Sequence, residues 1–509
     1  MNICLIESCK FVSLTNFVST ISMPPIGLAY IASAAREAGH SVCVIDGPGS
    51  DPRNYFDFKG FRIRGLSNER LIARIPREVE VIGLGCMFTS HWIYVRELIR
   101  DIREQFPNAF IIMGGEHPTG FPEFSLQQAP LDAVVIGEGE ETIVQLLDHL
   151  RRKLPLDEVH GVGFRNTDGA IRVNPRRNRI RDIDSIPRPA WDLFDIGMYN
   201  EINQPHGASQ GNFMPMLATR GCPFSCTFCT SSNMWTIRWI PRNHKLVVNE
   251  MQHYCETYST SDFQFEDLTA IVKKAWIVDF CDEIISRGMN ITFQLPSGTR
   301  SEAIDYEVAK KLKAAGCHEF AFAPESGDPR VLEAIKKKVQ LPKMFASARS
   351  AIKAGINVGC FFIIGFPEDN YTSILKTYVA IVKCALIGFT NVNLNAYSPQ
   401  PNTESFRKLK EEGLISDLSD KYLMSLFTFQ DFGAKKTSYN RRLGDWELSF
   451  LVILGVGLFY IIYFLRKPYR IIQLFIDLLS DSSSNKSTKM VKSLLKDVTK
   501  VTKNKLQKA

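Results

Sequence analysis

Short apolar runs alternate with amphipathic stretches along this chain, and this alternation constrains the fold more than any other feature. Near-continuous apolar runs rich in β-branched residues are typical of parallel strands buried on both faces. Five such runs lie at 2–8, 41–46, 79–85, 109–115 and 132–137. The stretches 26–38, 91–105 and 140–152 have helical period. Residues 1–152 are therefore predicted to form a doubly wound, Rossmann-like α/β domain whose ligand site lies outside the carboxyl ends of the strands.

Glycines gather where these strands are expected to end, in loops at 23–27, 83–88, 114–119 and 137–140. A glycine lets the backbone approach a large ligand without a Cβ in the way. For any one loop, glycines that merely end a strand or cap a helix remain an equal alternative. Four such loops on one rim favour a ligand site. A nicotinamide fingerprint fits poorly, because no GxGxxG follows the first strand and the segment 83–85 lacks the third glycine.

Strand and helix alternate again in residues 213–400, after a connector at 153–212 that contains a predicted hairpin (162–165 with 170–173). The helical stretches include 275–286 and 331–337. Six βα units curl into a partial (β/α)6 barrel, whose site again lies at the carboxyl ends of the strands. The six strand candidates are 213–219, 262–266, 290–295, 319–323, 358–364 and 391–396.

Three cysteines, Cys222, Cys226 and Cys229, follow the first barrel strand on a loop that contains Gly, Pro and Ser. Thiolates four and then three residues apart can wrap one face of a compact metal centre. A structural zinc site needs four ligands, and the nearest downstream candidates, His244 and Cys255, have no zinc-finger spacing. The spacing favours a 4Fe–4S cluster with one open iron, and zinc or inert structural cysteines are the alternative.

With Phe228 before the last cysteine, this triplet resembles the signature of the radical S-adenosylmethionine (radical SAM) enzymes. The chain resembles the members of that family that carry an N-terminal cobalamin-binding domain, over about residues 1–410. The matching segments are 24–30, 114–119, 137–140, 265–267, 296–300, 323–327 and 364–367.

The resemblance implies that Cys222, Cys226 and Cys229 hold the cluster and that S-adenosylmethionine chelates its open iron. A cytosolic electron donor is then needed to reduce the cluster, and cleavage of S-adenosylmethionine gives a 5′-deoxyadenosyl radical. For the carboxylates the alternative is an ordinary surface or capping role. The residues expected to contact S-adenosylmethionine are Phe228, Glu266, Asp267, Ser297, Arg300, Glu325, Ser326 and Gly365.

Cobalamin is the ligand that the resemblance implies for residues 1–152. The segment has no DxHxxG motif, and His91 and His117 lie outside such a context, so cobalamin is expected to bind without a histidine on cobalt. The residues expected to contact cobalamin are Pro24, Pro25, Gly27, Gly85, Cys86, Met87, Gly114, Gly115, Glu116, Thr119, Gly137, Glu138, Gly139 and Glu140.

The resemblance favours a C-methyltransferase that acts on an unactivated carbon of a small-molecule substrate through the radical and methylcobalamin. Relatives include oxidative cyclases and ring-rearranging enzymes, which are the second alternative, and a non-enzymatic cobalamin-responsive regulator is the third. Relatives often have Pro-Gly-Thr after the sixth strand, where this chain reads Tyr-Ser-Pro-Gln-Pro-Asn-Thr at 397–403. The mouth of the site is therefore expected to differ.

An apolar segment follows a predicted helical extension at 401–446. The 18-residue run 448–465 contains no charge, which makes it a candidate spanning helix at the short end of the range. A buried helix of the barrel cap is the alternative. A single crossing would place the lysine-rich tail 481–509 outside the cell, against the positive-inside tendency. We therefore expect a cytoplasmic enzyme attached through 447–480 to the inner face of a membrane, with a lipophilic substrate.

The net charge of +7 does not indicate nucleic-acid binding. Eight lysines and two aspartates give residues 481–509 a net charge of +6, which leaves +1 for the other 480 residues. A duplex-binding enzyme would carry its basic residues on the folded body. Twelve cysteines, several of them within apolar runs, favour a reducing compartment, and the first residues do not resemble a signal peptide.

Overall fold

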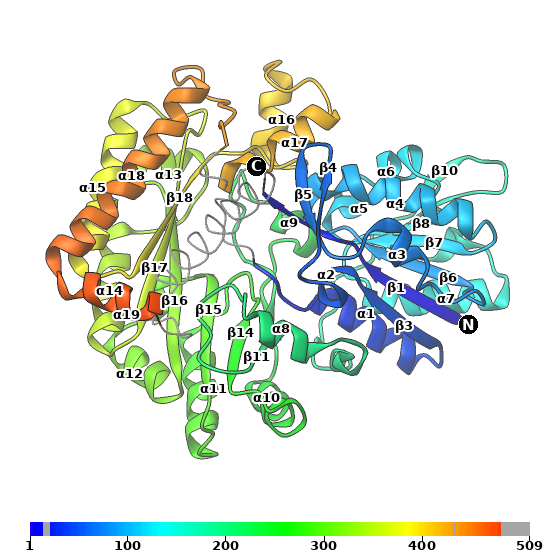
Figure 1. Ribbon diagram of the computed structural model, residues 1–509, viewed down its shortest axis with the longest axis horizontal. Coiled ribbons are helices and arrows are strands. Elements are labelled where there is room, and N and C mark those ends of the chain that lie inside the picture. Colours follow the sequence, from blue (N-terminus) through cyan, green and yellow to red (C-terminus); the bar gives the residue numbers. More distant parts are fainter. Residues whose placement is uncertain (14–20, 431–433, 480–509) are drawn as a thin grey trace, which may run out of the picture.

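The computed structural model describes residues 1–13, 21–430 and 434–479, and the predicted lysine-rich tail lies outside the described residues. Two sheets with their helices lie side by side in Figure 1. The first is a seven-stranded sheet of order β10-β9-β8-β7-β6-β1-β3, in which β9 pairs antiparallel with both β8 and β10 and all other pairings are parallel. Its strands are β1 (Asn2–Glu7), β3 (Ser41–Asp46), β6 (Val81–Gly85), β7 (Phe110–Gly114), β8 (Ala133–Val135), β9 (Val162–Arg165) and β10 (Ile171–Val173).

Successive residues of β1 pack into different cores, which confirms the doubly wound prediction. Ile3 and Leu5 contribute to one apolar cluster with α1 and α7, and Cys4 and Ile6 contribute to another with α4 and α6. Alternating side chains point to opposite faces of a strand, so both faces of this sheet are covered. The helices here are α1 (Ile26–Glu37), α2 (Gly47–Ser50), α3 (Asn68–Ile72), α4 (Trp92–Gln105), α5 (Glu116–Gly120), α6 (Pro122–Gln128) and α7 (Glu140–Arg152).

The predicted partial barrel is confirmed as six parallel strands in sequential order, β11-β14-β15-β16-β17-β18. Its strands are β11 (Phe213–Met216), β14 (Asp262–Phe265), β15 (Thr292–Thr299), β16 (Cys317–Glu325), β17 (Asn357–Ile364) and β18 (Asn391–Ala396). Its helices are α8 (Ile196–Ile202), α9 (Ser231–Trp235), α10 (His244–Tyr258), α11 (Lys274–Ser286), α12 (Tyr306–Ala314), α13 (Pro329–Ala334), α14 (Leu341–Lys353) and α15 (Tyr371–Ile387).

Two predicted elements differ from the structure, and each difference lies beside the cysteine loop. The first barrel strand was expected to run to residue 219, but β11 ends at Met216 and a short antiparallel pair follows, β12 (Thr219–Arg220) with β13 (Ile240–Pro241). The helix predicted at 331–337 ends at Ala334, because Lys336 has a left-handed φ of 55° that no helix continues. A small sheet that was not predicted, β2 (Lys10–Ser13), β5 (Phe61–Arg64) and β4 (Tyr55–Phe58), packs against Tyr94 of α4.

The C-terminal helix α18 (Asp445–Arg466) packs along α15 and β18. Its buried residues include Leu448, Val452 and Phe459, which share one face of the helix. A Cβ on Gly455 would lie 2.4 Å from a Leu394 methyl carbon, so this close approach requires glycine. The remaining elements are α16 (Glu404–Glu411), α17 (Asp420–Ser425) and α19 (Tyr469–Leu479).

Candidate functional site

The cysteine loop is held in place by a carboxylate at the end of the next strand. Asp267 follows β14 and is buried, and its oxygens accept hydrogen bonds from the backbone N–H of Ala218 at 3.2 Å and from Thr219 Oγ1 at 2.6 Å. These bonds end β11 and turn the chain toward Cys222. Burial raises the pKa of Asp267 to about 6, although its hydrogen-bond donors oppose the rise. Asp267 therefore acts on the site through this turn.

The three cysteines of this loop are half-buried and lie close enough to influence one another. Burial raises the pKa of Cys226 to about 11, with further contributions from the neighbouring Cys229 and Cys222 thiols, while Lys337 opposes the rise. Among the described residues, no three His, Cys, Asp or Glu side chains are arranged so that they could hold one metal ion together. A cubane cluster places each cysteine on a different iron, so it does not require the three thiols to converge on one ion.

The other carboxylates predicted for S-adenosylmethionine lie at the carboxyl ends of the barrel strands and are paired. Glu266 Oε1 lies 2.8 Å from His206 Nδ1, and Glu325 Oε1 lies 2.8 Å from the Lys337 ammonium group. Glu325 has a left-handed φ of 67°, which is unusual for a residue other than glycine and marks a functional or strained position. Ser326 is buried beside it and accepts the backbone N–H of Asp328 at 3.1 Å.

The remaining residues predicted for this ligand lie around the same end of the barrel. The Phe228 ring packs edge-on against the Phe366 ring, with 5.4 Å between the two ring centroids. Gly365 has φ of 90° and donates its N–H to Asp369 at 2.9 Å. Ser297 lies exposed in the irregular part of β15. Arg300 turns to the outer wall of the barrel, as described below.

Three of the four glycine-rich loops of the first domain, those after β6, β7 and β8, contact one another at the carboxyl ends of these strands. Thr119 joins two of them, because its hydroxyl donates to the Gly115 carbonyl at 2.7 Å and accepts the Gly137 N–H at 2.9 Å. Gly115 has φ of 117°, and a Cβ there would lie 2.5 Å from the Cys86 carbonyl oxygen. Met87 on the loop after β6 is 48% exposed. Tight glycine backbone beside an exposed apolar side chain suits a large flat ligand such as a corrin.

The rest of this predicted set lies at the ends of β6 and β7, in α5 and at the start of α1. Gly85 and Gly114 end β6 and β7, and Glu116 is the first residue of α5. Burial raises the pKa of the Glu116 carboxyl group, while a hydrogen bond from Thr230 opposes the rise. Pro24, Pro25 and Gly27 lie at the start of α1, where Pro25 is the N-cap residue.

Glu138 and Glu140 belong to a buried ionic network behind the rim. Glu138 pairs with Arg179 at 2.6 Å and with Arg220 at 3.2 Å, and Glu140 pairs with Arg220 at 2.5 Å. Arg179 and Arg220 also lie over the Trp235 ring. Burial alone would raise the pKa of Glu140, but Arg220 outweighs it and the pKa is lowered. Glu138 and Glu140 thus hold the rim to the cysteine loop, and both are buried; their contact with cobalamin stays a prediction.

His91 and His117 each pack among aromatic side chains. His117 is completely buried and stacks on Trp92 at 4.7 Å. His91 lies among Phe11, Phe88 and Phe427, with ring centroids 5.1 to 5.7 Å away. Burial lowers the pKa of both imidazoles to about 3.

Several residues of the site had no signal in the sequence. Glu7 ends β1, where burial raises its pKa to about 7, and a Cβ on Gly85 would lie 3.3 Å from its carboxylate. His206 and Lys337 face Glu266 and Glu325, and Arg176 contacts the loop at Gly137. His206, Lys337 and Arg176 come from distant segments of the chain, and no motif marks them. Glu7 could have been found only from its place at the end of a predicted buried strand.

Two protein-family models match the chain, which confirms the predicted resemblance. The B12 binding domain matches residues 15–147, and the radical SAM superfamily matches residues 216–381. The chain is 32% identical over 359 residues to an uncharacterized methyltransferase of Pyrococcus horikoshii, which covers 70% of this chain and 72% of the relative.

Two further relatives carry names that describe different reactions. The cytidylyl-2-hydroxyethylphosphonate methyltransferase of Streptomyces wedmorensis is 28% identical and covers 79% of this chain and 80% of its own length. The anaerobic magnesium-protoporphyrin IX monomethyl ester cyclase of a Synechocystis strain is 29% identical, over 62% of this chain and 59% of its own length.

The fold matches that of the radical S-adenosylmethionine methyltransferase TsrM from Kitasatospora setae, solved with tryptophan and a SAM analog bound. The TM-score is 0.62 at 17% identity, and the match covers 81% of this chain and 76% of TsrM. This likeness confirms the predicted α/β architecture.

Proposed function

This chain belongs to the cobalamin-dependent radical SAM enzymes, and we propose that it methylates an unactivated carbon atom of a small molecule. One observation carries the proposal. Arg220, two residues before Cys222, is bonded to Glu138 and Glu140 on the loop after β8. The cysteine loop and the glycine-rich rim therefore border one site, where a radical source and a methyl donor would be within reach of the same substrate.

The residues of the chain have separate roles in this proposal. Cys222, Cys226 and Cys229 would hold the cluster, and the loops at Gly85, Gly115 and Gly137 would bind cobalamin. When bound, S-adenosylmethionine supplies the radical and cobalamin supplies the methyl group. Glu266, with its partner His206, and the backbone at Phe228 and Gly365 would orient S-adenosylmethionine.

A product assay on anaerobically reconstituted protein tests this function. Methylation yields S-adenosylhomocysteine and 5′-deoxyadenosine together. A cyclase, the second candidate that the Synechocystis relative supports, yields 5′-deoxyadenosine without equimolar S-adenosylhomocysteine. A regulator yields neither. Equimolar formation of both products, with transfer of labelled methyl to the substrate, is the expected result.

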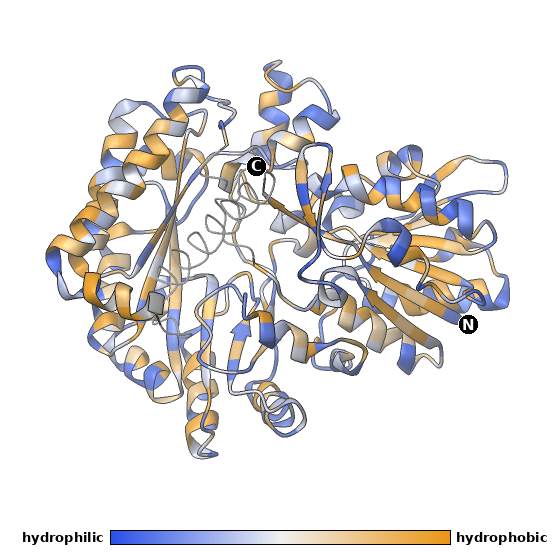
Figure 2. Cartoon of the chain, viewed as in Figure 1, coloured by the Kyte–Doolittle hydropathy of each residue, from blue (hydrophilic) through white to orange (hydrophobic). Residues whose placement is uncertain are grey.

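We further propose that the enzyme attaches to the inner face of a membrane through α18 and α19 and acts on a lipophilic substrate. Among the described residues, α18 is the one helix long and apolar enough to span a membrane, and 28% of its apolar window is buried. Three apolar side chains on its outer face are between 59% and 75% exposed: Phe450, Ile461 and Leu465. Figure 2 shows hydrophobic colour along α18 and α19. Because one face of α18 packs on the barrel, attachment in the plane of the membrane suits it better than a crossing.

Flotation with anionic phospholipid vesicles tests the attachment. The full chain is expected to float, and the variant F450S/I461S/L465S is expected to float at most one tenth as well, because about 0.8 kcal/mol of transfer free energy is lost per buried CH₂. A matched control replaces three exposed apolar residues elsewhere, Ile237, Ile285 and Leu414, by serine. Equal flotation of the two variants would exclude attachment through α18.

A further inference from the structure

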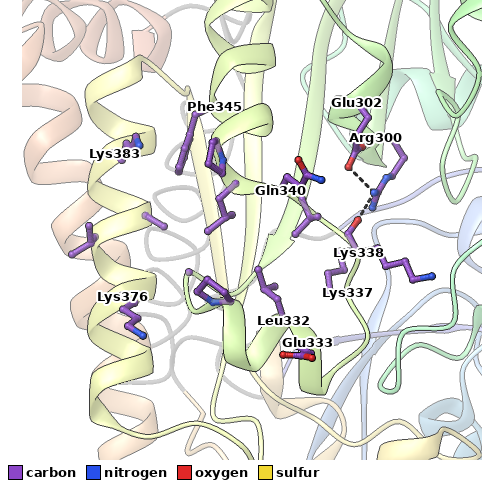
Figure 3. Close-up of a pocket in the computed structure, with 17 residues that line it drawn as sticks. Arg300, Glu302, Leu332, Glu333, Lys337, Lys338, Gln340, Phe345, Lys376 and Lys383 are labelled. Carbon is purple, nitrogen blue, oxygen red and sulfur yellow. Dashed lines mark hydrogen bonds and ion pairs between the residues drawn. The ribbon is translucent and has the colours of Figure 1, made fainter.

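A groove of about 930 Å³ runs along the outer wall of the barrel, between α15 and the segment from α13 to α14 (Figure 3). Its floor is apolar and includes Leu341, Phe345 and Val379. Its charged lining has more cations than anions: the cations are Arg300, Lys337, Lys338, Lys376 and Lys383, and the anions are Glu302 and Glu333. Apart from Arg300, which was predicted to contact S-adenosylmethionine, the predicted function gives the lining of this groove no role.

Part of this positive charge is left without a partner. Lys337 pairs with Glu325 inside the barrel, Arg300 pairs with Glu302 at 2.7 Å, and Lys376 lies 3.3 Å from an oxygen of Asp328. Within the described part of the chain, neither Lys338 nor Lys383 forms an ion pair, and the Lys383 ammonium group lies 4.4 Å from the centre of the Phe345 ring. Glu333 also forms no ion pair among the described residues and offsets one of these two lysines, so the groove presents a small net positive charge to solvent.

The segment that forms one wall of the groove is also packed against the cysteine loop. The Thr227 N–H donates to the Ile335 carbonyl at 3.1 Å, and Cys226 Sγ lies 3.9 Å from the Lys336 carbonyl oxygen. On the same side, the Arg300 guanidinium lies 4.2 Å from the centre of the Phe224 ring, between Cys222 and Cys226 in the sequence, and donates to the Lys338 carbonyl. A single layer of residues thus separates the groove from the cysteines.

We propose that this groove is the docking surface for an acidic one-electron carrier protein that reduces the cluster. The inference rests on the proposed function, since it requires a cluster at Cys222, Cys226 and Cys229. In the transfer the carrier loses one electron and the cluster gains it, and no proton or further reactant is needed. An apolar floor with a charged rim is the usual composition of a transient protein interface, and positive side chains here attract an acidic partner. The carrier would then be held one layer of residues away from the cysteine loop.

The test uses the reconstituted full chain with two acidic carriers in turn, reduced flavodoxin and a reduced ferredoxin. The variant K338E/K383E reverses two exposed charges that have no part in cluster binding. Its rate of cluster reduction, followed by absorbance in stopped flow at low salt, is expected to fall tenfold or more with at least one carrier. The wild-type rate with that carrier is expected to fall as salt is added. Binding of the oxidised carrier, measured by calorimetry, should weaken in parallel.

Two controls separate docking from other effects. Lys245→Glu, on the exposed start of α10, reverses a charge elsewhere on the barrel and should leave both rates unchanged. Reduction by dithionite, which needs no docking surface, should be the same in all variants. Loss of the dithionite rate in K338E/K383E, unchanged rates with both carriers, or a wild-type chain that neither carrier reduces would each overturn the proposal. The readouts are cluster reduction and carrier binding, so a failure of methyl transfer alone would not affect them.

Discussion

Arg220 donates a hydrogen bond to Glu140 across 2.5 Å, with side chains only 5% and 10% exposed. The arginine lies in β12, two residues before Cys222, and the glutamate begins α7 of the first domain. Glu138 completes the arrangement from the same loop, 3.2 Å from Arg220. The position of the cysteine loop relative to the cobalamin-type rim is therefore fixed by buried charges as well as by apolar packing.

Arg220→Met is expected to destabilise the protein strongly, because it leaves the Glu138 and Glu140 carboxylates buried with less positive charge. Removing one partner of a buried pair costs about 3–5 kcal/mol. Arg36→Met is the control, since Arg36 and Asp192 form an exposed pair at 2.6 Å whose loss costs at most about 1 kcal/mol. Urea unfolding measures both, and similar small losses in the two variants would show that the buried network is not needed for stability.

Asp267 should make the stability of the protein depend on pH between about 4 and 6. Its pKa is about 6 in the folded chain and 3.8 in its ordinary state, so the folded state holds the proton more tightly. This contribution is fully present below pH 3.8 and is lost as the pH rises through 6, which amounts to about 2–3 kcal/mol. The Asp267→Asn variant has no titrating carboxyl group at this position, so its stability lacks this pH-dependent contribution. Relative to the variant, the wild type should lose this amount between pH 4 and pH 7 in urea unfolding; an identical pH profile would contradict the assignment.

Much of the fold follows from local patterns in the sequence. The buried parallel strands were predictable, because continuous apolar runs such as 79–85 have few alternatives in a chain of alternating strands and helices. The early end of β11 was not predictable, since it depends on the Asp267 carboxylate some 50 residues away in the sequence. The predicted helix at 331–337 failed for a related reason, because packing of the Ile335 and Lys336 carbonyls against the cysteine loop replaced the last helical turn.

The residues of the candidate site likewise fall into those that a local motif marks and those that only the fold brings together. The cysteine spacing and the glycine loops are local signals, and the structure places them at the facing ends of the two sheets. The partners His206, Lys337 and Arg179 come from distant segments, and no motif marks them. The assignment of Glu138 and Glu140 to cobalamin, made from their motif, stays a prediction, and the ion pairs that both carboxylates form had no signal in the sequence.

Cys222→Ala, Cys226→Ala and Cys229→Ala are each expected to lose the cluster, because in the proposed site each thiolate would hold a different iron. Iron content and visible absorbance after anaerobic reconstitution measure the loss, and cleavage of S-adenosylmethionine should fall to background. Cys255→Ala is the matched control, since this thiol is also half-buried but lies on α10. A variant at position 222, 226 or 229 that kept four irons per chain and normal cleavage would disprove the cluster assignment.

Gly115→Ala should distort the rim and weaken cobalamin binding. The residue has φ of 117°, where a side chain is strained, and its new Cβ would lie 2.5 Å from the Cys86 carbonyl oxygen, which is backbone and cannot rotate away. Positive-φ strain of this kind costs about 1–3 kcal/mol before the steric clash is added. Gly457→Ala is the control, because a Cβ there meets nothing within 4 Å and lies in the interior of α18, where alanine is favoured by about 0.5–1 kcal/mol. Urea unfolding and spectroscopic titration with cobalamin should therefore separate the two variants, with stability and affinity reduced in G115A alone. Unchanged cobalamin affinity in a folded G115A protein would mean that the loop after β7 does not contact the ligand.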